Sequence, residues 1–585
     1  MAASRSSIPS AKHHRSIDLA GASPLESLSE QLEKQVDPFG ITTSMANAHA
    51  AWLMHPQELT RAVTGLTGDL LALQGHVMRR AIGLPSEDVV TPHSDDGRFS
   101  DPVWEQSPTW DIVKEWYLAF THRLEDMYFE TPGLSDKERR RAAFWLRKWL
   151  NAVAPTNFFW SNPVALRKFV ESKGETLTQG IQNVLRDMQA GDIRMVDEKA
   201  FKVGVDLATT PGQVVYRNRL LEVIQYSPST VQVYKQPVVI VTPWINKYYI
   251  LDLTPKKSMV KYLVDQGFTV FVTSWKNPGA EMANVAYEDY ITEGVAEIIR
   301  VACAICKVPQ VNAVGYCIGG TTLTAYMAWA NRKFGDPAKV PVASWTLLTT
   351  LTDFARPGDI EVFVDPASVK WIEDSMAKKG FLDGKEMASS FRMLRSNSLI
   401  WHYFVHSYLY GESLAPFDVL FWNTDTTRMP SAMHSYYLRE MYLKNNLIKK
   451  DALTLGGQPI DLERIAQPLY AVTAEDDHIA PWRQCYRIRK YVTSPTRFVL
   501  STSGHILGIV NPPVNPPKRS FWVGEPKRGE NVEHWESAAE KHPGSWWDDW
   551  KQWLIQKSGE KVSPPKVHKD YPPLTAAPGA YVLEV

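Results

Sequence analysis

The chain has 585 residues, 44% of them hydrophobic and 22% charged, a composition typical of a globular protein with a large core. Lysine plus arginine and aspartate plus glutamate both number 64, and this zero net charge argues against bulk electrostatic binding to nucleic acid or an anionic membrane. No apolar run reaches the roughly 18 residues that span a bilayer. Four cysteines are too few for a disulfide framework, so the sequence predicts a protein of a reducing cytoplasm.

The N-terminal third is expected to be helical. Residues 1–25 are polar, lack the apolar stretch of a secretory signal and are predicted to be disordered. Beyond them, apolar residues recur at spacings of three and four, and Ser135 and Glu138 have the spacing of a capping box. We therefore expect a separate α-helical domain over residues 26–204. Its predicted helices span residues 57–78, 135–153 and 177–191.

From residue 205 onwards, short β-branched runs alternate with helical segments, which predicts a mainly parallel α/β sheet in a catalytic domain over residues 205–585. The interval of about 351–450 breaks this alternation with a long, aromatic and mostly helical segment. We expect it to be a cap over a site. The predicted strands span residues 238–241, 268–273, 311–314, 343–348, 469–473 and 497–500.

The candidate nucleophile is Cys317, which lies in the segment Gly-Tyr-Cys-Ile-Gly directly after a predicted strand. This pattern has the form of a nucleophile elbow, in which a strained turn between a strand and a helix exposes the reactive side chain. Gly315 and Gly319 are expected where a side chain would collide with neighbouring backbone. The alternative is a buried structural cysteine, a common fate of a free thiol.

An acid and a histidine follow the nucleophile in the chain order of the α/β-hydrolase fold. Asp477 comes after the strand at 469–473, within a run of three carboxylates that could also be a simple surface turn. His505 comes after the next strand. Because these strands are parallel, the loops that follow them meet at one edge of the sheet. The order predicts a Cys317–His505–Asp477 triad on an α/β-hydrolase fold with a helical cap.

Two backbone N–H groups are predicted to form an oxyanion hole. One belongs to Ile318, the residue after the nucleophile, and the other to Ile245, in the loop after the strand at 238–241. Cys303 and Cys306 form a C-x-x-C pair without a second pair or a histidine cluster, so we interpret them as buried helix thiols and expect no metal site.

Several segments together resemble the polyhydroxyalkanoate synthases, and the similarity covers roughly residues 95–555. The tail around residues 542–547 is similar to the single-subunit, short-chain group, class I. Trp244 and Leu507 depart from what we expect of that group and leave monomer preference open. The matching segments are GYCIGG at 315–320, APTN at 154–157, PWINKYYILDL at 243–253, VTSWKNP at 272–278, FDVLFWN at 417–423, DHIAPW at 477–482 and GHI at 504–506.

The resemblance implies polymerisation of (R)-3-hydroxyacyl-coenzyme A, with 3-hydroxybutyryl as the expected acyl group, through an acyl-cysteine thioester. In this scheme Cys317 is acylated, His505 is the general base and Asp477 orients it or acts on the attacking hydroxyl. The thioester is a substrate, and no cofactor is expected. The resemblance also implies a cytoplasmic homodimer at the surface of polymer granules, with phasin-like partners. Candidate substrate or coenzyme A contacts are Arg395, His478, Trp422 and Leu507.

Two other functions fit parts of the sequence. A cysteine-dependent hydrolase, such as a thioesterase or a polyester depolymerase, would have the same fold and triad. A non-enzymatic granule-coat protein would account for the neutral charge and for the clustering of the 21 tryptophans. Tryptophan has an apolar ring with a polar N–H, so these clusters fit either core packing or adhesion to an apolar surface.

Overall fold

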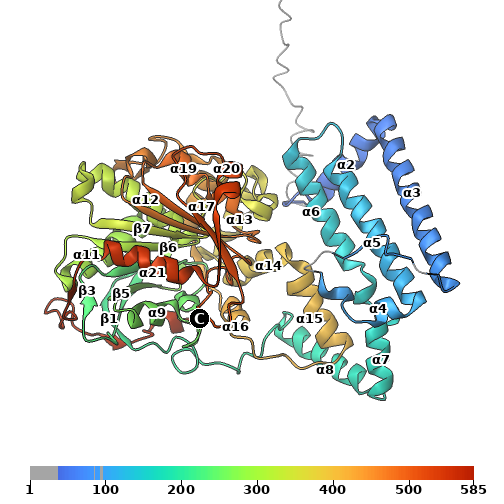
Figure 1. The fold of residues 1–585 in the computed structure, drawn as a ribbon, viewed down its shortest axis with the longest axis horizontal. Helices are drawn as coiled ribbons and strands as arrows, with labels where there is room; N and C mark the ends of the chain where they lie inside the picture. The colour runs from blue at the N-terminus through green and yellow to red at the C-terminus, as the bar shows by residue number, and fades with distance from the viewer. Residues whose placement is uncertain (1–36, 85, 93–95) are drawn as a thin grey trace, which may run out of the picture.

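The structure is a computed structural model that describes residues 37–84, 86–92 and 96–585, so the predicted disordered segment 1–25 lies outside the described residues. Figure 1 shows a helical N-terminal region on one side and a sheet flanked by helices on the other, linked by part of the cap. None of the described helices is both long and apolar enough to cross a membrane.

The three predicted N-terminal helices are confirmed as α3, α6 and α8. Ser135 caps α6 as predicted: its hydroxyl accepts the N–H of Glu138 at 3.4 Å, and the Glu138 carboxylate accepts the N–H of Ser135 at 2.8 Å. The small residues Ala142 and Ala143 are fully buried where α6 packs against its neighbours. The helices of this region are α2 (Ile41–Met54), α3 (Pro56–Ala81), α4 (Val103–Gln106), α5 (Pro108–Phe129), α6 (Asp136–Ala152), α7 (Pro163–Glu171) and α8 (Glu175–Ala190).

The sheet has eleven strands in the order β15-β14-β13-β12-β7-β6-β4-β5-β2-β1-β17, and its centre is parallel as predicted. All six predicted strands are present. They are β4 (Val238–Val241), β5 (Val270–Trp275), β6 (Val311–Tyr316), β7 (Val342–Leu348), β12 (Leu469–Ala474) and β13 (Thr496–Ser501).

The strands missing from the prediction are antiparallel and lie at the two ends of the sheet. In β14 buried residues alternate with half-buried ones, so it lacks the continuous apolar run that marks the central strands. These strands are β1 (Gly212–Arg217), β2 (Leu221–Tyr226), β14 (Ser520–Gly524), β15 (Glu540–Pro543) and β17 (Thr575–Ala576).

A separate hydrophobic cluster covers each face of the sheet. Val239 and Val241 of β4 pack in one cluster and Val238 and Ile240 in the other, as the alternation of a strand requires. The first cluster includes side chains of α11 (Ala296–Cys306) and α12 (Ile318–Phe334); the second includes those of α9 (Met259–Asp265) and α21 (Trp546–Lys557). The helices therefore form a layer on each side of the sheet (Figure 1).

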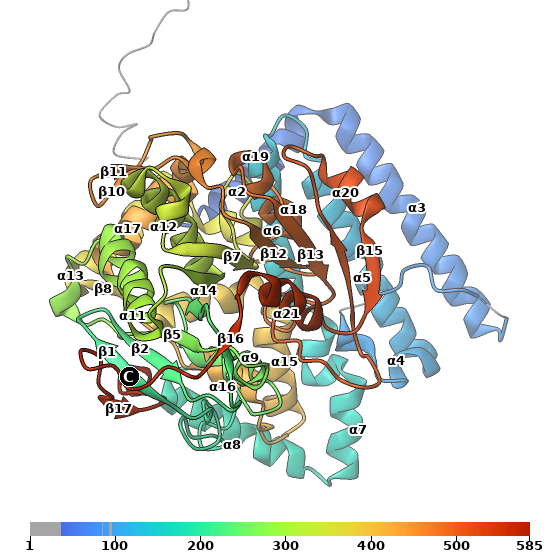
Figure 2. The same cartoon turned by 60° about the vertical axis from the view of Figure 1, so that its left-hand side comes forward.

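The insertion between β7 and β12 is helical, as predicted, but its parts pack on different regions. α13 and α17 contact each other, and α17 also contacts α10 (Tyr287–Asp289), a short helix of the sheet domain. The part from α14 to Glu412 packs on the N-terminal helices instead, and Figures 1 and 2 both show α15 beside α8. The helices of the insertion are α13 (Pro366–Lys379), α14 (Gly384–Leu394), α15 (His402–Phe404), α16 (Asp418–Thr424) and α17 (Ser431–Tyr437).

The contact between α8 and the insertion is close enough to involve backbone. A Cβ added at Gly180 would lie 2.0 Å from the carbonyl oxygen of Tyr408, so only glycine fits there. Asn183 donates to the carbonyl of Ser407 at 3.0 Å, and the Tyr408 hydroxyl donates to Asp187 at 2.7 Å. This part of the cap is thus fixed to the N-terminal region.

The tryptophan clusters divide between core and surface. Trp546, Trp547 and Trp550 are fully buried, as core packing predicts. On the N-terminal region, however, Trp116 is 51% exposed and Trp160 is 81% exposed. Core packing is therefore confirmed for the C-terminal cluster, and adhesion to an apolar surface stays a prediction for the exposed tryptophans of the N-terminal region.

Candidate active site

Cys317 lies at the turn between β6 and α12 with φ 53° and ψ −124°, a conformation that is strained for a residue with a side chain. Space around it is tight. A Cβ at Gly315 would come 2.5 Å from the Cα of Gly320, and a Cβ at Gly319 would come 2.5 Å from the carbonyl oxygen of Val241. The elbow predicted from the glycines is confirmed, and Cys317 is half-buried and packs against both hydrophobic clusters.

The loops after β12 and β13 bring Asp477 and His505 together. The two strands run parallel and are paired up to Ala474 and Ser501, so both loops leave the sheet at the same edge. His505 Nδ1 lies 2.6 Å from Asp477 Oδ2, and both side chains are buried. The other carboxylate oxygen of Asp477 accepts two backbone N–H groups, at 2.9 and 2.8 Å. The carboxylate is therefore held in a fixed orientation towards the imidazole.

The charge on His505 reflects opposing effects. Burial disfavours the imidazolium and lowers the pKa of His505. The Asp477 carboxylate and the Cys317 side chain act in the opposite direction, through charge and hydrogen bonding. Together they outweigh burial and raise the pKa of His505 well above its ordinary value. Since the ionised carboxylate can only accept, Nδ1 is the donor to Asp477 and Nε2 is left for Cys317. The structure thus brings all three predicted residues into one cluster.

The loop after β4 carries Ile245, and the cap fixes the orientation of its peptides. The hydroxyl of Thr427 lies 2.5 Å from the carbonyl oxygens of both Trp244 and Ile245, and the Thr427 N–H donates to the Ile245 carbonyl at 3.3 Å. Because a trans peptide is planar, the N–H of Ile245 points away from the Trp244 carbonyl and so away from Thr427. Ile318 begins α12, where backbone N–H groups have no partner within the helix.

Trp422, a predicted substrate contact, lies beside the same loop. Its indole is buried and donates to the carbonyl of Lys247 at 2.6 Å. Lys247 is itself buried and pairs with Asp425 of the cap at 2.8 Å. Trp422 therefore helps to hold the Ile245 loop against the cap.

Two cap tyrosines that were not among the predicted site residues lie near the nucleophile. Burial raises the pKa of Tyr442, and a negative charge on Cys317 raises it further; the same two effects act on Tyr437. Tyr437 also packs edge-on against Trp244, with ring centroids 6.0 Å apart. The cap thus reaches the region of Cys317 through aromatic side chains, and no spacing pattern in the sequence marks them.

Arg395 and His478 lie together at the edge of a cavity of about 1050 Å³. Arg395 Nε donates to His478 Nδ1 at 3.3 Å, and burial together with the Arg395 charge lowers the pKa of His478 to about 4. Leu507 is separate from this cavity: it is 37% exposed, and its carbonyl accepts from Arg519. Of the predicted substrate contacts, the structure therefore brings only Arg395 and His478 together.

The C-x-x-C pair lies on α11, as predicted. Burial raises the pKa of Cys303 to about 11 and that of Cys306 to about 12, so neither thiol ionises readily at neutral pH.

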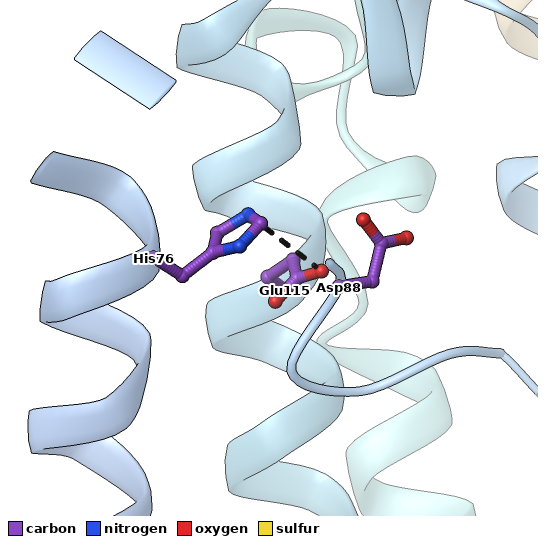
Figure 3. Close-up of side chains that lie close together, drawn as sticks. All are labelled: His76, Asp88 and Glu115. Carbon is purple, nitrogen blue, oxygen red and sulfur yellow. Dashed lines mark ion pairs between the residues drawn. The ribbon is translucent and has the colours of Figure 1, made fainter. Parts of the chain in front are cut away.

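A second group of ionisable side chains, some of them buried, lies between α3 and α5 in the N-terminal region. Figure 3 shows His76 and Glu115 facing each other, 4.0 Å apart, with Asp88 on the connecting segment. Their ligand atoms lie close enough to one another to suggest a metal site. The full cluster is Asp88, Asp111, Glu115, His76, Arg80 and Lys114.

Cations of the protein already occupy the space between these carboxylates. Arg80 pairs with Asp111 at 2.7 Å, and Lys114 lies 3.2 Å from Asp111 and 3.5 Å from Asp88. Burial raises the pKa of Glu115, which favours its neutral form. Two basic side chains of the protein therefore already pair with two of the three carboxylates.

Family models match most of the chain. The N-terminus of poly-beta-hydroxybutyrate polymerase (PhaC) matches residues 95–263, and the alpha/beta hydrolase fold matches residues 237–512. Together with the parallel sheet, this second match establishes the α/β-hydrolase fold. Solved structures such as the carboxyl esterase from Bacillus coagulans are more remote: it is 10% identical, covers 59% of this chain and 97% of its own, and has a TM-score of 0.32.

Poly(3-hydroxyalkanoate) polymerases from other organisms align with most of this chain. The poly(3-hydroxyalkanoate) polymerase of Methylorubrum extorquens is 40% identical over 93% of this chain and 89% of its own. The polymerase subunit PhaC of Cupriavidus necator is 39% identical over 83% of each chain. The chain therefore belongs to the poly(3-hydroxyalkanoate) polymerase family, a family of acyltransferases on the α/β-hydrolase fold.

Proposed function

We propose that this enzyme polymerises (R)-3-hydroxyacyl groups from coenzyme A thioesters into polyhydroxyalkanoate through an acyl-Cys317 intermediate. The observation that carries the proposal is the buried Asp477–His505 pair at 2.6 Å, which leaves one imidazole nitrogen for a cysteine on a nucleophile elbow. The names of the relatives support the same reaction.

In the first half-reaction, His505 Nε2 takes the proton of the Cys317 thiol, and the thiolate attacks the thioester carbonyl. The N–H groups of Ile318 and Ile245 stabilise the oxyanion. The bond between the carbonyl carbon and the sulfur of coenzyme A then breaks. Coenzyme A takes the proton from His505 and leaves as a free thiol, so the acyl group is now a thioester of Cys317.

In the second half-reaction, a hydroxyl of the polymer end or of another acyl group loses its proton to His505 and attacks the acyl-Cys317 carbonyl. The carbon–sulfur bond breaks, an oxoester forms and His505 returns the proton to Cys317. The first step exchanges one thioester for another, and the second is downhill because a thioester is more activated than an oxoester. A serine nucleophile would lose this driving force at acylation.

Asp477 acts in this scheme by orienting His505. Both of its carboxylate oxygens already accept hydrogen bonds, one from the imidazole and one from backbone N–H groups, which supports an orienting role over direct attack on a substrate proton.

The cap keeps water from the intermediate. Tyr437 and Tyr442 lie near Cys317 within the apolar packing of the cap, where water would otherwise compete with the hydroxyl nucleophile. Exclusion of water distinguishes a polymerase from a hydrolase that uses the same triad.

The proposed donor is 3-hydroxybutyryl-coenzyme A, with Arg395 and His478 near its path of entry, and the scheme calls on no further cofactor. We further propose a cytoplasmic homodimer at the surface of polymer granules, alongside phasin-like proteins. Exposed Trp116 and Trp160 on the N-terminal region support contact with such an apolar surface.

Incubation with (R)-3-hydroxybutyryl-coenzyme A tests the proposal directly. We expect release of coenzyme A to match the formation of polyester, with little free acid. Release of coenzyme A with free 3-hydroxybutyrate and no polymer would show a thioesterase instead. A granule-coat protein would release no coenzyme A, and its Cys317→Ala variant would behave like the wild type.

A further inference from the structure

The cavity beside His478 is built by three separate parts of the chain. Lys148 of α6 belongs to the N-terminal region, Trp401 and Tyr403 belong to the cap, and Asp476 and His478 belong to the loop after β12. At about 1050 Å³ it is large enough for a sizeable small molecule. Asp476 and His478, the neighbours of Asp477 in the chain, are part of its wall, so the cavity lies beside the candidate active site.

Most charges on the cavity wall are already paired. Of the five carboxylates that line it, three form ion pairs: Asp96 with Arg98, Asp101 with Arg167, and Glu412 with Lys168.

Lys148 differs from these cations. Its Nζ donates to the carbonyl of Leu394 at 2.8 Å, and among the residues that the structure describes no carboxylate lies within ion-pair distance of it. Burial lowers the pKa of Lys148 to about 8 although the more distant Asp359 carboxylate opposes this shift, and Nζ also lies 4.5 Å from the centre of the Phe144 ring. An anion bound in the cavity would further compensate the charge of Lys148.

Aromatic rings line the same cavity. Trp401, Tyr403 and Tyr410 all contribute to its wall on the cap side. Aromatic side chains bind purine bases by stacking, and basic side chains bind phosphate, so the two kinds of residue together suit a nucleotide with several phosphates.

We propose that this cavity binds the phosphorylated adenosine end of coenzyme A, with Lys148 of the N-terminal region on a phosphate and the cap aromatics around the base. This inference rests on the proposed use of coenzyme A thioesters. It assigns to the N-terminal helices a direct part in holding the donor. From the cavity, the pantetheine arm would pass His478 towards the Cys317 thiol, since His478 adjoins Asp477 in the chain.

Binding of coenzyme A itself, followed by isothermal titration calorimetry, tests the proposal without turnover. Lys148→Met should weaken binding at least about tenfold, as expected for the loss of one charged phosphate contact, and Lys148→Arg should retain most of it. Lys137→Met is a matched control: Lys137 lies on the same helix and also donates to a cap carbonyl, that of Val364 at 3.3 Å, but it is not part of the cavity wall.

A second variant in the cavity wall guards against a misfolded Lys148→Met protein. Ser398 is exposed and lines the cavity, so Ser398→Glu should fold normally and weaken binding by placing a negative charge near the phosphates. Unchanged binding in folded Lys148→Met, or in Ser398→Glu, would overturn the proposal.

Kinetics with a truncated donor separate this proposal from the proposed function. With 3-hydroxybutyryl-coenzyme A, Lys148→Met should raise KM about tenfold or more; with the same acyl group on N-acetylcysteamine, which has no phosphates, its KM should equal that of the wild type. An equal rise in KM with both donors would mean that Lys148 does not act through the nucleotide. If wild type binds coenzyme A but forms no polymer, the proposed function fails and the binding result still stands.

Discussion

The molecule buries a histidine beside carboxylates in two places, and the two clusters are used differently. At the edge of the sheet, His505 has one nitrogen on Asp477 and the other directed to Cys317. Between α3 and α5, His76 has Nδ1 2.8 Å from the Glu87 carbonyl and Nε2 3.4 Å from Asp111. A buried histidine–carboxylate pair is therefore not by itself a sign of catalysis.

What separates the two clusters is the partner of the second nitrogen and the balance of charge around it. No lysine or arginine pairs with Asp477 among the described residues, so its charge acts on His505. Asp111 is instead bound by Arg80 of α3 and by Lys114 of its own helix α5, and the first of these pairs joins the two helices. In the proposed mechanism the first cluster activates a nucleophile, whereas the second joins two helices. The predictions below test this division.

The largest effect is expected from His505→Gln. Glutamine fills similar space but cannot take a proton, so release of coenzyme A from 3-hydroxybutyryl-coenzyme A should fall by about 10³-fold or more, as the loss of a general base predicts. The unfolding midpoint should also fall, because the buried Asp477 carboxylate loses its partner, so the rates are compared at a temperature where both proteins are folded. Turnover within tenfold of the wild type would remove His505 from the mechanism.

At the second cluster the loss should be in stability rather than activity. Asp111→Asn leaves the fully buried Lys114 without its closest carboxylate, and removal of one partner from a buried pair costs about 3 kcal/mol. Hydrogen exchange of α3 and α5 should speed up accordingly, while kcat changes little. Asp69→Asn is the matched control, because Asp69 pairs with Arg123 on the same two helices but is exposed and should cost under about 1 kcal/mol. A large loss of kcat in folded Asp111→Asn would erase the distinction between the clusters.

A smaller kinetic effect should come from the cap. Thr427→Val keeps the shape of the side chain but removes the hydroxyl that holds the Trp244 and Ile245 carbonyls, so kcat should fall about tenfold at unchanged KM. This is less than the roughly 10²-fold expected when an oxyanion donor is removed outright. Thr427→Ser should restore the rate. Thr424→Val is the matched control, because it loses a comparable hydrogen bond, to the Phe421 carbonyl, that does not involve the Ile245 loop. Its kcat should equal that of the wild type. An equal fall in kcat at both positions would indicate a general loosening of the cap.

The raised pKa of His505 predicts a pH dependence of stability. The folded protein binds this proton more tightly than the unfolded chain, so the stabilisation is fully present below the unfolded value of about 6.5 and is lost as pH rises through the folded pKa. The free energy of unfolding of the wild type should therefore decline relative to that of His505→Gln between neutral and alkaline pH. If the free energies of unfolding of the two proteins changed in parallel with pH, the imidazole would bind its proton no more tightly in the folded than in the unfolded state.

The smallest effect is expected from Glu115→Gln. Burial already favours the neutral carboxyl, one oxygen accepts the Val89 N–H at 3.0 Å and the other has no hydrogen-bond partner among the described residues, so the amide should cost under about 1 kcal/mol. Added zinc or a chelator should leave the melting temperature unchanged. A rise in melting temperature that depends on zinc and disappears in Glu115→Gln would show that the cluster binds metal.

The parts of this structure that the sequence predicts are those encoded locally. Continuous apolar runs identify the central strands, and the glycines at 315 and 319 identify the elbow because a Cβ there meets backbone. The order of Cys317, Asp477 and His505 then places them at one edge, since the strands before them are parallel.

The remaining features depend on residues that are distant in the chain. Lys148 and the Leu394 carbonyl are 246 positions apart, and Thr427 is more than 180 positions from the loop that it holds. No periodicity links such pairs. The outer strands β14 and β15 are missed for a different reason: β14 alternates between buried and half-buried residues and β15 is mostly exposed, so neither has the continuous apolar run of a central strand.

The backbone contact at Gly180 has a consequence for exchanging parts between family members. Since the carbonyl of Tyr408 leaves no room for a side chain there, the segment from α14 to Glu412 is a piece of the N-terminal region, even though it lies within the second half of the chain. A chimera that exchanges only the first two hundred residues would pair α8 of one parent with the cap segment of the other. A transplant that carries residues 384–412 along would keep both halves of that contact from a single parent.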